Sequence, residues 1–147
     1  MLVEKTTIKN LVVIRMNPGD DVLASLTEAV KANNIKNAVI LTGVGSVQAY
    51  HYHVVASEEN VPKTLSSRTN VFTKGEKYSD VVNLNGCVIN GRVHAHIILS
   101  DKDIAYGGHL EPGTEVLTFL ITILGEVDYD LRGFDTVGNI EEFRKEP

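Results

Sequence analysis

The sequence of 147 residues contains one cysteine, no tryptophan and no long apolar run. Because a disulfide needs two thiols, Cys87 excludes an intramolecular disulfide and any metal site made of cysteines alone. No stretch approaches the roughly 20 apolar residues that cross a bilayer, and the segment after Met1 lacks the apolar core of a secretion signal. We therefore expect a soluble protein whose simplest location is the cytoplasm, where thiols stay reduced.

The sequence is also poor in positive charge. It has 14 lysine and arginine residues against 19 aspartate and glutamate residues, and its net charge is −5. A protein that binds nucleic acid mainly through phosphates usually has a basic stripe. The closest counterpart here is a group of scattered basic residues, Lys63, Arg68, Lys74 and Lys77. Such a group argues against DNA binding without excluding it.

The remaining composition is that of a globular domain. Hydrophobic residues make up 43% of the chain and charged residues 22%, which is the usual balance. A chain of this length buries about two-thirds of the surface that its unfolded form exposes, which is enough for a core without disulfides. We expect residues 1–147 to form a single domain.

Hydrophobic periodicity predicts one long helix and about seven strands. Residues 8–16 have apolar side chains at both odd and even positions, which is typical of a strand covered on both faces. A turn at residues 17–20 precedes a helix over residues 21–33. Asp20 or Gly19 can cap this helix. Further strands are expected over residues 38–42, 47–56, 81–89, 91–99, 104–110, 116–124 and 127–143, with short strands near Leu65 and Val71–Phe72.

This order of elements predicts an α+β fold, in which the helix packs on a curved, mainly antiparallel sheet or half-barrel. A doubly wound parallel fold would need several crossover helices, which this sequence does not supply. Residues 43–46 (Gly-Val-Gly-Ser) lack the G-x-G-x-x-G pattern and precede a strand, so they indicate a bulge or bend rather than a phosphate-binding loop.

The five histidines include two His-x-His pairs. Alternate residues of a strand point to the same face, so His94 and His96 can bind one metal ion together. The same geometry applies to His51 and His53, but the sequence offers no evident third ligand for that pair. We therefore assign His51 and His53 to a half-buried strand without a metal role.

The turn after His96 decides whether His109 can join the first pair. A two-residue turn at Asp101–Lys102 would place His109 opposite His94, and a four-residue loop would place it opposite His96. Directly opposed residues share a face, with Cβ atoms about 5 Å apart, whereas a loop with an odd number of residues would reverse the face. Gly107–Gly108 either lets backbone or a ligand approach closely or bends the segment away.

Three neutral imidazoles suit zinc, copper or nickel better than magnesium or calcium. Three protein ligands also leave one coordination position for water or substrate. The spacing therefore predicts a divalent-metal site, with zinc as the preferred ion, at His94, His96 and His109. No catalytic residue is assigned; the candidate acid or base groups, each typical of a solvated turn when taken singly, are Asp101, Asp103, Glu111 and Glu115.

Several motifs together resemble a known family, the plant- and prokaryote-conserved (PPC) domain, which plants join to AT-hook motifs. The resemblance covers nearly the whole chain and is strongest in the His-x-His and Gly-Gly-His motifs. The segments that carry it are Arg15 with residues 18–21, residues 42–47, residues 91–97, residues 107–110 and, more loosely, Arg132 with Phe134–Asp135.

The resemblance implies a curved antiparallel sheet flanked by a helix and assembled as a homotrimer. It also implies an architecture similar to that of acetolactate decarboxylase, whose three-histidine zinc site corresponds here to His94, His96 and His109. The family name brings a DNA-binding label as well, but the Arg-Gly-Arg-Pro core of an AT-hook is missing from this sequence. We therefore expect an oligomeric metal-binding protein that binds or acts on a small molecule, with a DNA-binding regulator or a trimeric scaffold as alternatives.

Overall fold

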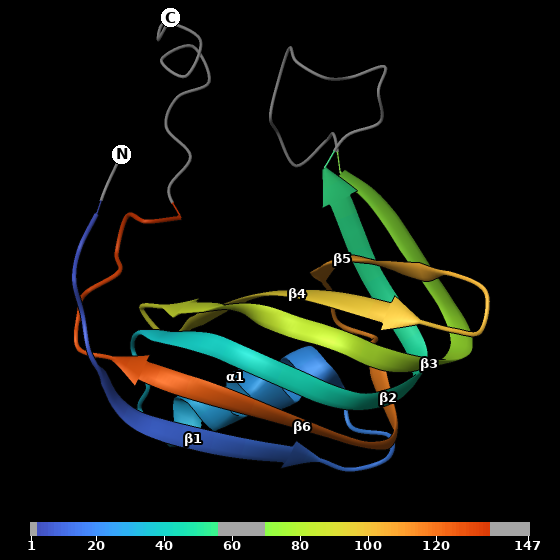
Figure 1. Cartoon of the computed structure of the whole chain (residues 1–147), viewed down its shortest axis with the longest axis horizontal. Coiled ribbons are helices and arrows are strands. Elements are labelled where there is room, and N and C mark those ends of the chain that lie inside the picture. The colour runs from blue at the N-terminus through green and yellow to red at the C-terminus, as the bar shows by residue number, and fades with distance from the viewer. Residues whose placement is uncertain (1–2, 56–69, 136–147) are drawn as a thin grey trace, which may run out of the picture.

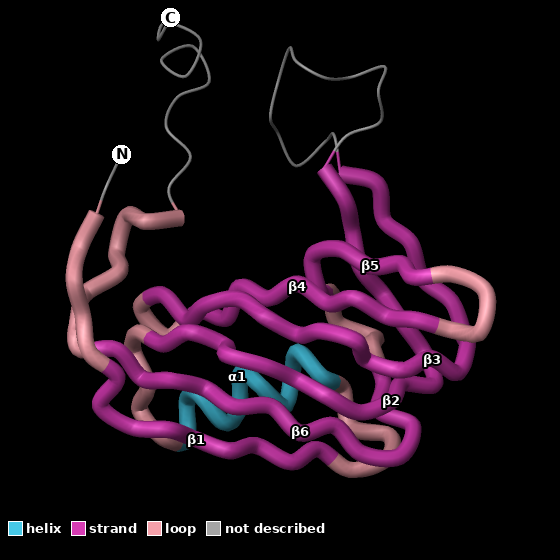
Figure 2. Tube along the Cα trace, in the orientation of Figure 1, coloured by secondary structure: helices cyan, strands magenta, loops and turns pink. Residues whose placement is uncertain are grey.

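The computed structural model of the chain describes residues 3–55 and 70–135, which form six strands and one helix. The strands lie in one sheet with the order β1-β6-β2-β3-β4-β5, and their pairings are antiparallel. Helix α1 covers one face of this curved sheet (Figures 1 and 2), which confirms the predicted α+β class. The elements are β1 (Ile8–Met16), α1 (Val22–Ala32), β2 (Ala38–Val55), β3 (Asn70–Ile89), β4 (Arg92–Ser100), β5 (Ala105–Leu110) and β6 (Glu115–Val127).

Helix α1 begins where the periodicity predicts, but a different residue caps it. The Asp21 carboxylate accepts a hydrogen bond from the Ala24 amide at 2.8 Å, and this satisfies one of the free N–H groups of the first turn. The Asp20 carboxylate instead accepts from the Asn17 amide at 2.7 Å and closes the preceding turn. The prediction that Asp20 or Gly19 caps the helix is therefore wrong, because the N-cap is Asp21.

The helix turns one apolar stripe toward the sheet. Its buried side chains are Val22, Leu26 and Val30, at the spacing of a single helix face. Each such burial is worth about 1.5–3 kcal/mol relative to exposure. Among the described residues, no helix has both the length and the apolar character needed to cross a bilayer.

The sheet has an inner face toward α1 and an outer face away from it. On β4 the side chains of Ala95, Ile97 and Leu99 are fully buried in the core that includes the helix residues. Because side chains alternate along a strand, His94 and His96 lie on the outer face. Burial on one side of β4 therefore determines the side on which its histidines lie.

The long strand β2 replaces two predicted strands and the break between them. Its register against β6 shifts between Ile40 and Thr42, between Gly45 and Val47, and again before Ala49, so the predicted bulge is confirmed. In the same way, β3 joins the segments predicted near residues 71–72 and over residues 81–89 into one strand.

Two other predictions about strands are wrong. Residues 128–135 form bends and a turn rather than the predicted final strand. The Phe134 amide donates to the Leu131 carbonyl at 3.0 Å, and the Asp130 carboxylate accepts from the Arg132 amide at 3.0 Å. Strand β1 is covered on one face only, since Leu11 and Val13 are 62% and 66% exposed in the single chain. Leu65 and residues 136–147 lie outside the described residues.

Candidate metal centre

The β4–β5 hairpin determines where the third predicted ligand lies. Ser100 pairs with Ala105, so residues 101–104 form a four-residue loop, and His96 pairs with His109. The four-residue alternative is therefore confirmed, and the two-residue turn is wrong. Directly opposed residues share a face, so the His109 side chain projects from the outer face beside His96.

The Asp101 carboxylate organises this loop. Its Oδ1 accepts from the amides of Asp103 at 2.6 Å and Ile104 at 3.0 Å, and its Oδ2 binds the Lys77 ammonium. The Lys77 ammonium and the two amides hold the pKa of Asp101 at about 2. Asp103 bonds Lys102 at 2.7 Å. Asp101 and Asp103 therefore stabilise the hairpin loop, and within the described part of the chain neither forms a hydrogen bond or ion pair with a predicted metal ligand.

The two histidines of β4 have converging ring nitrogens. Their Nε2 atoms are 3.4 Å apart, and their rings are nearly parallel, with centroids 5.4 Å apart and an interplanar angle of 11°. His109 lies close to both, with ring centroids 4.8 Å from His94 and 5.4 Å from His96. The structure thus brings His94, His96 and His109 together on one face.

A fourth histidine reaches the same place from β2. His53 pairs with His109 across β2 and β5, and their rings stack with centroids 4.4 Å apart. Gly108 makes this pairing possible, since a Cβ at that position would lie 2.4 Å from the His53 carbonyl oxygen. The close approach predicted at the glycine pair is therefore an approach of backbone to backbone.

Glu111 joins the group beside His53 and His109. Its Oε1 accepts a hydrogen bond from His53 Nδ1 at 2.6 Å and lies 3.4 Å from His109 Nδ1. Within the part of the chain that the structure describes, His109 Nδ1 is buried without a hydrogen-bond partner. We call these five residues the histidine cluster; its members are His53, His94, His96, His109 and Glu111.

Partial burial keeps three of the histidines uncharged near neutral pH. It is the main cause that lowers the pKa values of His94, His96 and His109 below 6.5. Neighbouring imidazoles lower these pKa values further, whereas the Glu111 carboxylate opposes the shift at His109. Neutral imidazoles keep a free lone pair, which is the form that binds metals.

The separation of the two ring nitrogens on β4 fits two ligands of one divalent metal ion. Two imidazoles on one tetrahedral zinc ion, each about 2.0–2.1 Å from it, have nitrogens about 3.3 Å apart, close to the Nε2 separation of His94 and His96. Among the described residues, the one group of three donors whose ligand atoms all lie within 4.8 Å of one another is His53, His109 and Glu111. The predicted set of His94, His96 and His109 does not meet this separation. The two sets share His109.

The half-buried strand predicted for His51 and His53 is confirmed, since both lie in β2 and are partly buried. Their surroundings differ. The His51 ring bonds outside the histidine cluster, with Nδ1 2.7 Å from the Pro112 carbonyl oxygen, although the His51 carbonyl accepts a hydrogen bond from the Glu111 amide at 3.0 Å. His53 lies within the cluster, and no local pattern could have shown this, because its neighbour His109 belongs to a distant strand.

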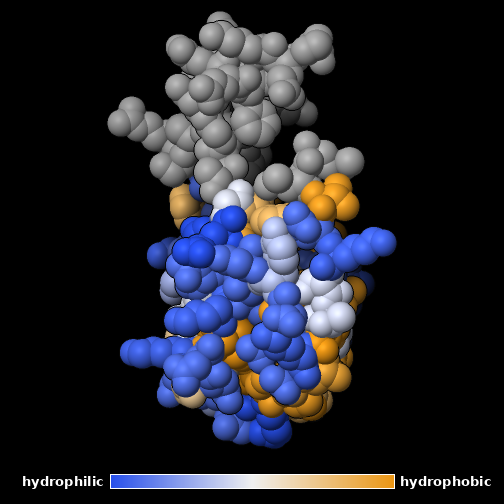
Figure 3. Space-filling model, turned by 90° about the vertical axis from the view of Figure 1, so that its left-hand side faces the viewer, coloured by the Kyte–Doolittle hydropathy of each residue, from blue (hydrophilic) through white to orange (hydrophobic). Residues whose placement is uncertain are grey.

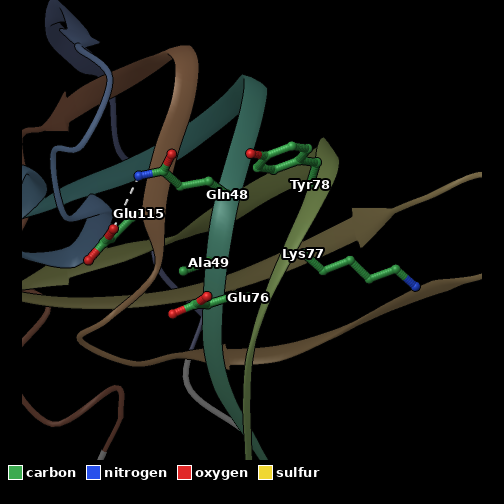
Figure 4. Close-up of a pocket in the computed structure, with 6 residues that line it drawn as sticks. All are labelled: Gln48, Ala49, Glu76, Lys77, Tyr78 and Glu115. Carbon is green, nitrogen blue, oxygen red and sulfur yellow. Dashed lines mark hydrogen bonds between the residues drawn. The ribbon is translucent and has the colours of Figure 1, made fainter.

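The last candidate carboxylate, Glu115, lies in another part of the surface. Its Oε2 accepts from Gln48 Nε2 at 3.3 Å, and both line an open hollow of about 620 Å³. Figure 4 shows this hollow, which is lined by Gln48, Ala49, Glu76, Lys77, Tyr78 and Glu115 and contains no histidine among them.

Comparison with solved structures finds the same fold in several proteins. A metal-containing protein from Archaeoglobus fulgidus is 20% identical, with a TM-score of 0.73 over 88% of each chain. A plant- and prokaryote-conserved protein from Pyrococcus horikoshii is 21% identical, with a TM-score of 0.71 over 88% of this chain and 87% of that chain. Two further similar proteins, from Bacteroides thetaiotaomicron and Ralstonia eutropha, have provisional DNA-binding names.

The expected likeness to acetolactate decarboxylase is also found. A protein from Staphylococcus aureus that is described as similar to that enzyme is 17% identical, with a TM-score of 0.51 over 80% of this chain and 52% of that chain. Among curated proteins, the chain has no match. The model of the Plants and Prokaryotes Conserved (PCC) domain matches residues 3–128, and the chain therefore belongs to this family.

Proposed function

We propose that this protein binds one divalent metal ion, zinc by preference, through His94, His96 and His109, and uses it to bind or transform a small molecule. The observation that carries the proposal is the 3.4 Å separation of the Nε2 atoms of His94 and His96. The pairing of His96 with His109 adds the third imidazole on the same face. When bound, such an ion polarises carbonyl oxygens and lowers the pKa of bound water.

The chemistry of the surrounding residues agrees with a metal role. The three imidazoles have lowered pKa values, so they need not lose a proton before they bind the ion near neutral pH. The similar protein from Archaeoglobus fulgidus is described as containing metal. The net charge of −5 favours a cation over DNA as the ligand.

The proposal includes a homotrimer, and the outer face supports an interface between chains. Paired residues form a row across the sheet from Leu11 through Gly125, Val39 and Cys87 to His94, so the histidines share a face with uncovered apolar side chains. Figure 3 views the molecule from the left-hand side of Figure 1 and shows hydrophobic surface gathered at the lower right. Exposed apolar surface of this kind commonly marks an interface; the exposed residues include Leu11, Val13, Leu41, Val44 and Val82.

Zinc titration tests the metal proposal. Protein without a histidine tag is made metal-free and titrated with zinc in competition with a chromogenic chelator. We expect one zinc per chain and an affinity more than about 100-fold lower in His96→Ala, since loss of a ligand exceeds the usual cost of losing an outer-sphere partner. His51→Ala is the matched control, because His51 lies outside the cluster. Equal affinity in wild type and His96→Ala would contradict the proposal.

A further inference from the structure

We propose that Glu111, held in place by His53, is a positioning residue that keeps the proton of His109 on Nδ1 and leaves Nε2 as its metal-binding nitrogen. The inference rests on the proposed function for its metal, but it concerns a proton that can be located in the metal-free protein. It assigns His53 and Glu111 to the outer sphere of the metal centre rather than to the ligand set.

The distance between His53 and Glu111 is that of a hydrogen bond and not that of two ligands. His53 Nδ1 and Glu111 Oε1 are 2.6 Å apart, whereas two ligand atoms on one zinc ion lie about 3.3 Å apart. A carboxylate can only accept, so His53 donates its Nδ1 proton. The short contact is typical of a hydrogen bond to a charged group.

His109 presents its own Nδ1 to the same oxygen. The separation is 3.4 Å, and this nitrogen is buried without a hydrogen-bond partner among the described residues. A shift of a few tenths of an ångström closes a normal hydrogen bond of about 2.9 Å, and an unpaired buried polar atom is costly. The Glu111 carboxylate therefore favours the tautomer of His109 that is protonated at Nδ1.

The tautomer determines which nitrogen can bind the metal. A neutral imidazole with its proton on Nδ1 has its lone pair on Nε2. His94 and His96 face each other through the same nitrogen, Nε2. All three histidines then offer equivalent nitrogens, and a metal-bound histidine commonly donates its other N–H to a carboxylate.

His53 is itself confined, so it can hold Glu111. Its ring lies between two others, stacked on His109 with centroids 4.4 Å apart and next to Phe72 at 5.1 Å. Its side chain is only 12% exposed. A ring packed in this way has little freedom to turn its Nδ1 proton away from the Glu111 carboxylate.

The rival arrangement is direct binding of the ion by His53, His109 and Glu111, the one described group of three whose donor atoms all lie within 4.8 Å of one another. The two arrangements differ in the role of Glu111. As a positioning residue, Glu111 can be removed without changing the number of ligands on the ion. As a ligand, its removal changes the coordination of the ion.

Three measurements on the full chain separate these arrangements. Long-range ¹H–¹⁵N NMR of the metal-free protein locates the proton on His109. Zinc competition gives the affinities of wild type, Glu111→Ala and Glu111→Gln. The visible spectrum of the cobalt(II) form reports the coordination of the ion. Glu115→Gln is the matched control, because Glu115 is a partly buried carboxylate that bonds Gln48 outside the cluster.

We expect the His109 proton on Nδ1 in wild type and a weaker preference in Glu111→Ala. Zinc affinity falls by about 10–100-fold in Glu111→Ala, while the cobalt spectrum keeps its shape. Glu111→Gln recovers part of the affinity, since its amide oxygen still accepts one hydrogen bond. Glu115→Gln leaves all three measurements unchanged.

A proton on Nε2 of His109 in wild type, an unchanged zinc affinity in Glu111→Ala, or a cobalt spectrum altered by that substitution would overturn the inference. Wild-type protein that binds zinc but carries this proton on Nε2 contradicts the inference alone. Wild-type protein that binds no zinc but carries the proton on Nδ1 contradicts the proposed function alone.

Discussion

His53 and His109 lie directly opposite each other on β2 and β5, with their rings stacked at an interplanar angle of 23°. The two residues meet because the curved sheet brings its edge strand β5 back to the far part of β2 (Figure 1). The histidine cluster is therefore a product of the curvature of the sheet, and not of the β4–β5 hairpin alone. Any substitution that separates β5 from β2 should disturb the histidine cluster.

Gly108→Ala tests this dependence on the close approach of the strands. The new methyl group would lie 2.4 Å from the His53 carbonyl oxygen, so one strand must move. We expect a loss of about 1–3 kcal/mol in the free energy of unfolding, as for other overpacked positions, together with weaker zinc binding. Urea unfolding and chelator competition measure the two effects. Wild-type stability and affinity in this variant would show that β5 does not need the contact.

The metal-free protein should lose stability as the pH falls below about 6.5. The pKa values of His94, His96 and His109 are lowered in the folded state, so the unfolded chain takes up protons first. The stability that depends on these groups is therefore complete above the unfolded pKa and is lost as the pH falls through the folded values. Melting temperatures of the metal-free protein between about pH 7.5 and pH 5 measure the loss.

The control for this pH effect is the double variant His94→Asn, His96→Asn, which removes two of the three titrating groups and keeps polar side chains. Its melting temperature should fall less steeply over the same pH range. If the wild-type and variant curves have equal slopes, the histidines are not the source of the pH dependence.

Asp101 should make a separate contribution at lower pH. Its folded pKa of about 2 lies below the ordinary value of 3.8, so its contribution is present above the ordinary value and is lost as the pH falls toward 2. Asp101→Asn should remove this part of the acid sensitivity and lower stability near neutral pH, because the ion pair with Lys77 is lost. Urea unfolding at several acidic pH values measures both effects.

Asp103→Asn is the comparison for Asp101, since Asp103 is in the same loop but bonds the exposed Lys102. It should retain the acid sensitivity of the wild type. Identical acid unfolding of all three proteins would show that the Asp101 contacts do not stabilise the hairpin.

The proposed homotrimer predicts a particle of about three times the 16.1 kDa chain mass. Val13→Lys places a charge on the exposed apolar face of β1, where Val13 is 66% exposed in the single chain. We expect this substitution to shift the particle toward the mass of one chain, because burial of an unpaired charge is costly. Light scattering after size exclusion measures the masses. Glu28→Lys on the exposed side of helix α1 is the control, and an equal trimeric mass for all three proteins would place the interface elsewhere.

Local features of the sequence were sufficient for the elements that carry their own signals. The periodicity of residues 8–16 and 21–33 predicts β1 and α1 almost to the residue. The sequence leaves the length of the loop after β4 open: either even length keeps His109 on the face of His96, whereas an odd length reverses it. The four-residue loop forms because the Asp101 carboxylate accepts two amides of that loop, and residue type alone does not specify this contact.

Long-range pairing explains what could not be predicted. The place of His53 depends on the return of β5 to β2, and no short motif encodes which two strands of a curved sheet will meet. Gly107–Gly108 indicated a close approach, but not its partner. The predicted strand at the C-terminal end failed over residues 128–135 for a local reason, since the Leu131–Phe134 turn interrupts its apolar alternation.

The most direct test of the metal centre is X-ray anomalous scattering from crystals of zinc-loaded protein, recorded on both sides of the zinc absorption edge. We expect one anomalous peak per chain, within about 2.1 Å of ring nitrogens of His94, His96 and His109, with Glu111 outside bonding distance of the ion. A peak bound by His53 and Glu111 instead, or no peak beside the three imidazoles, would contradict the proposed centre.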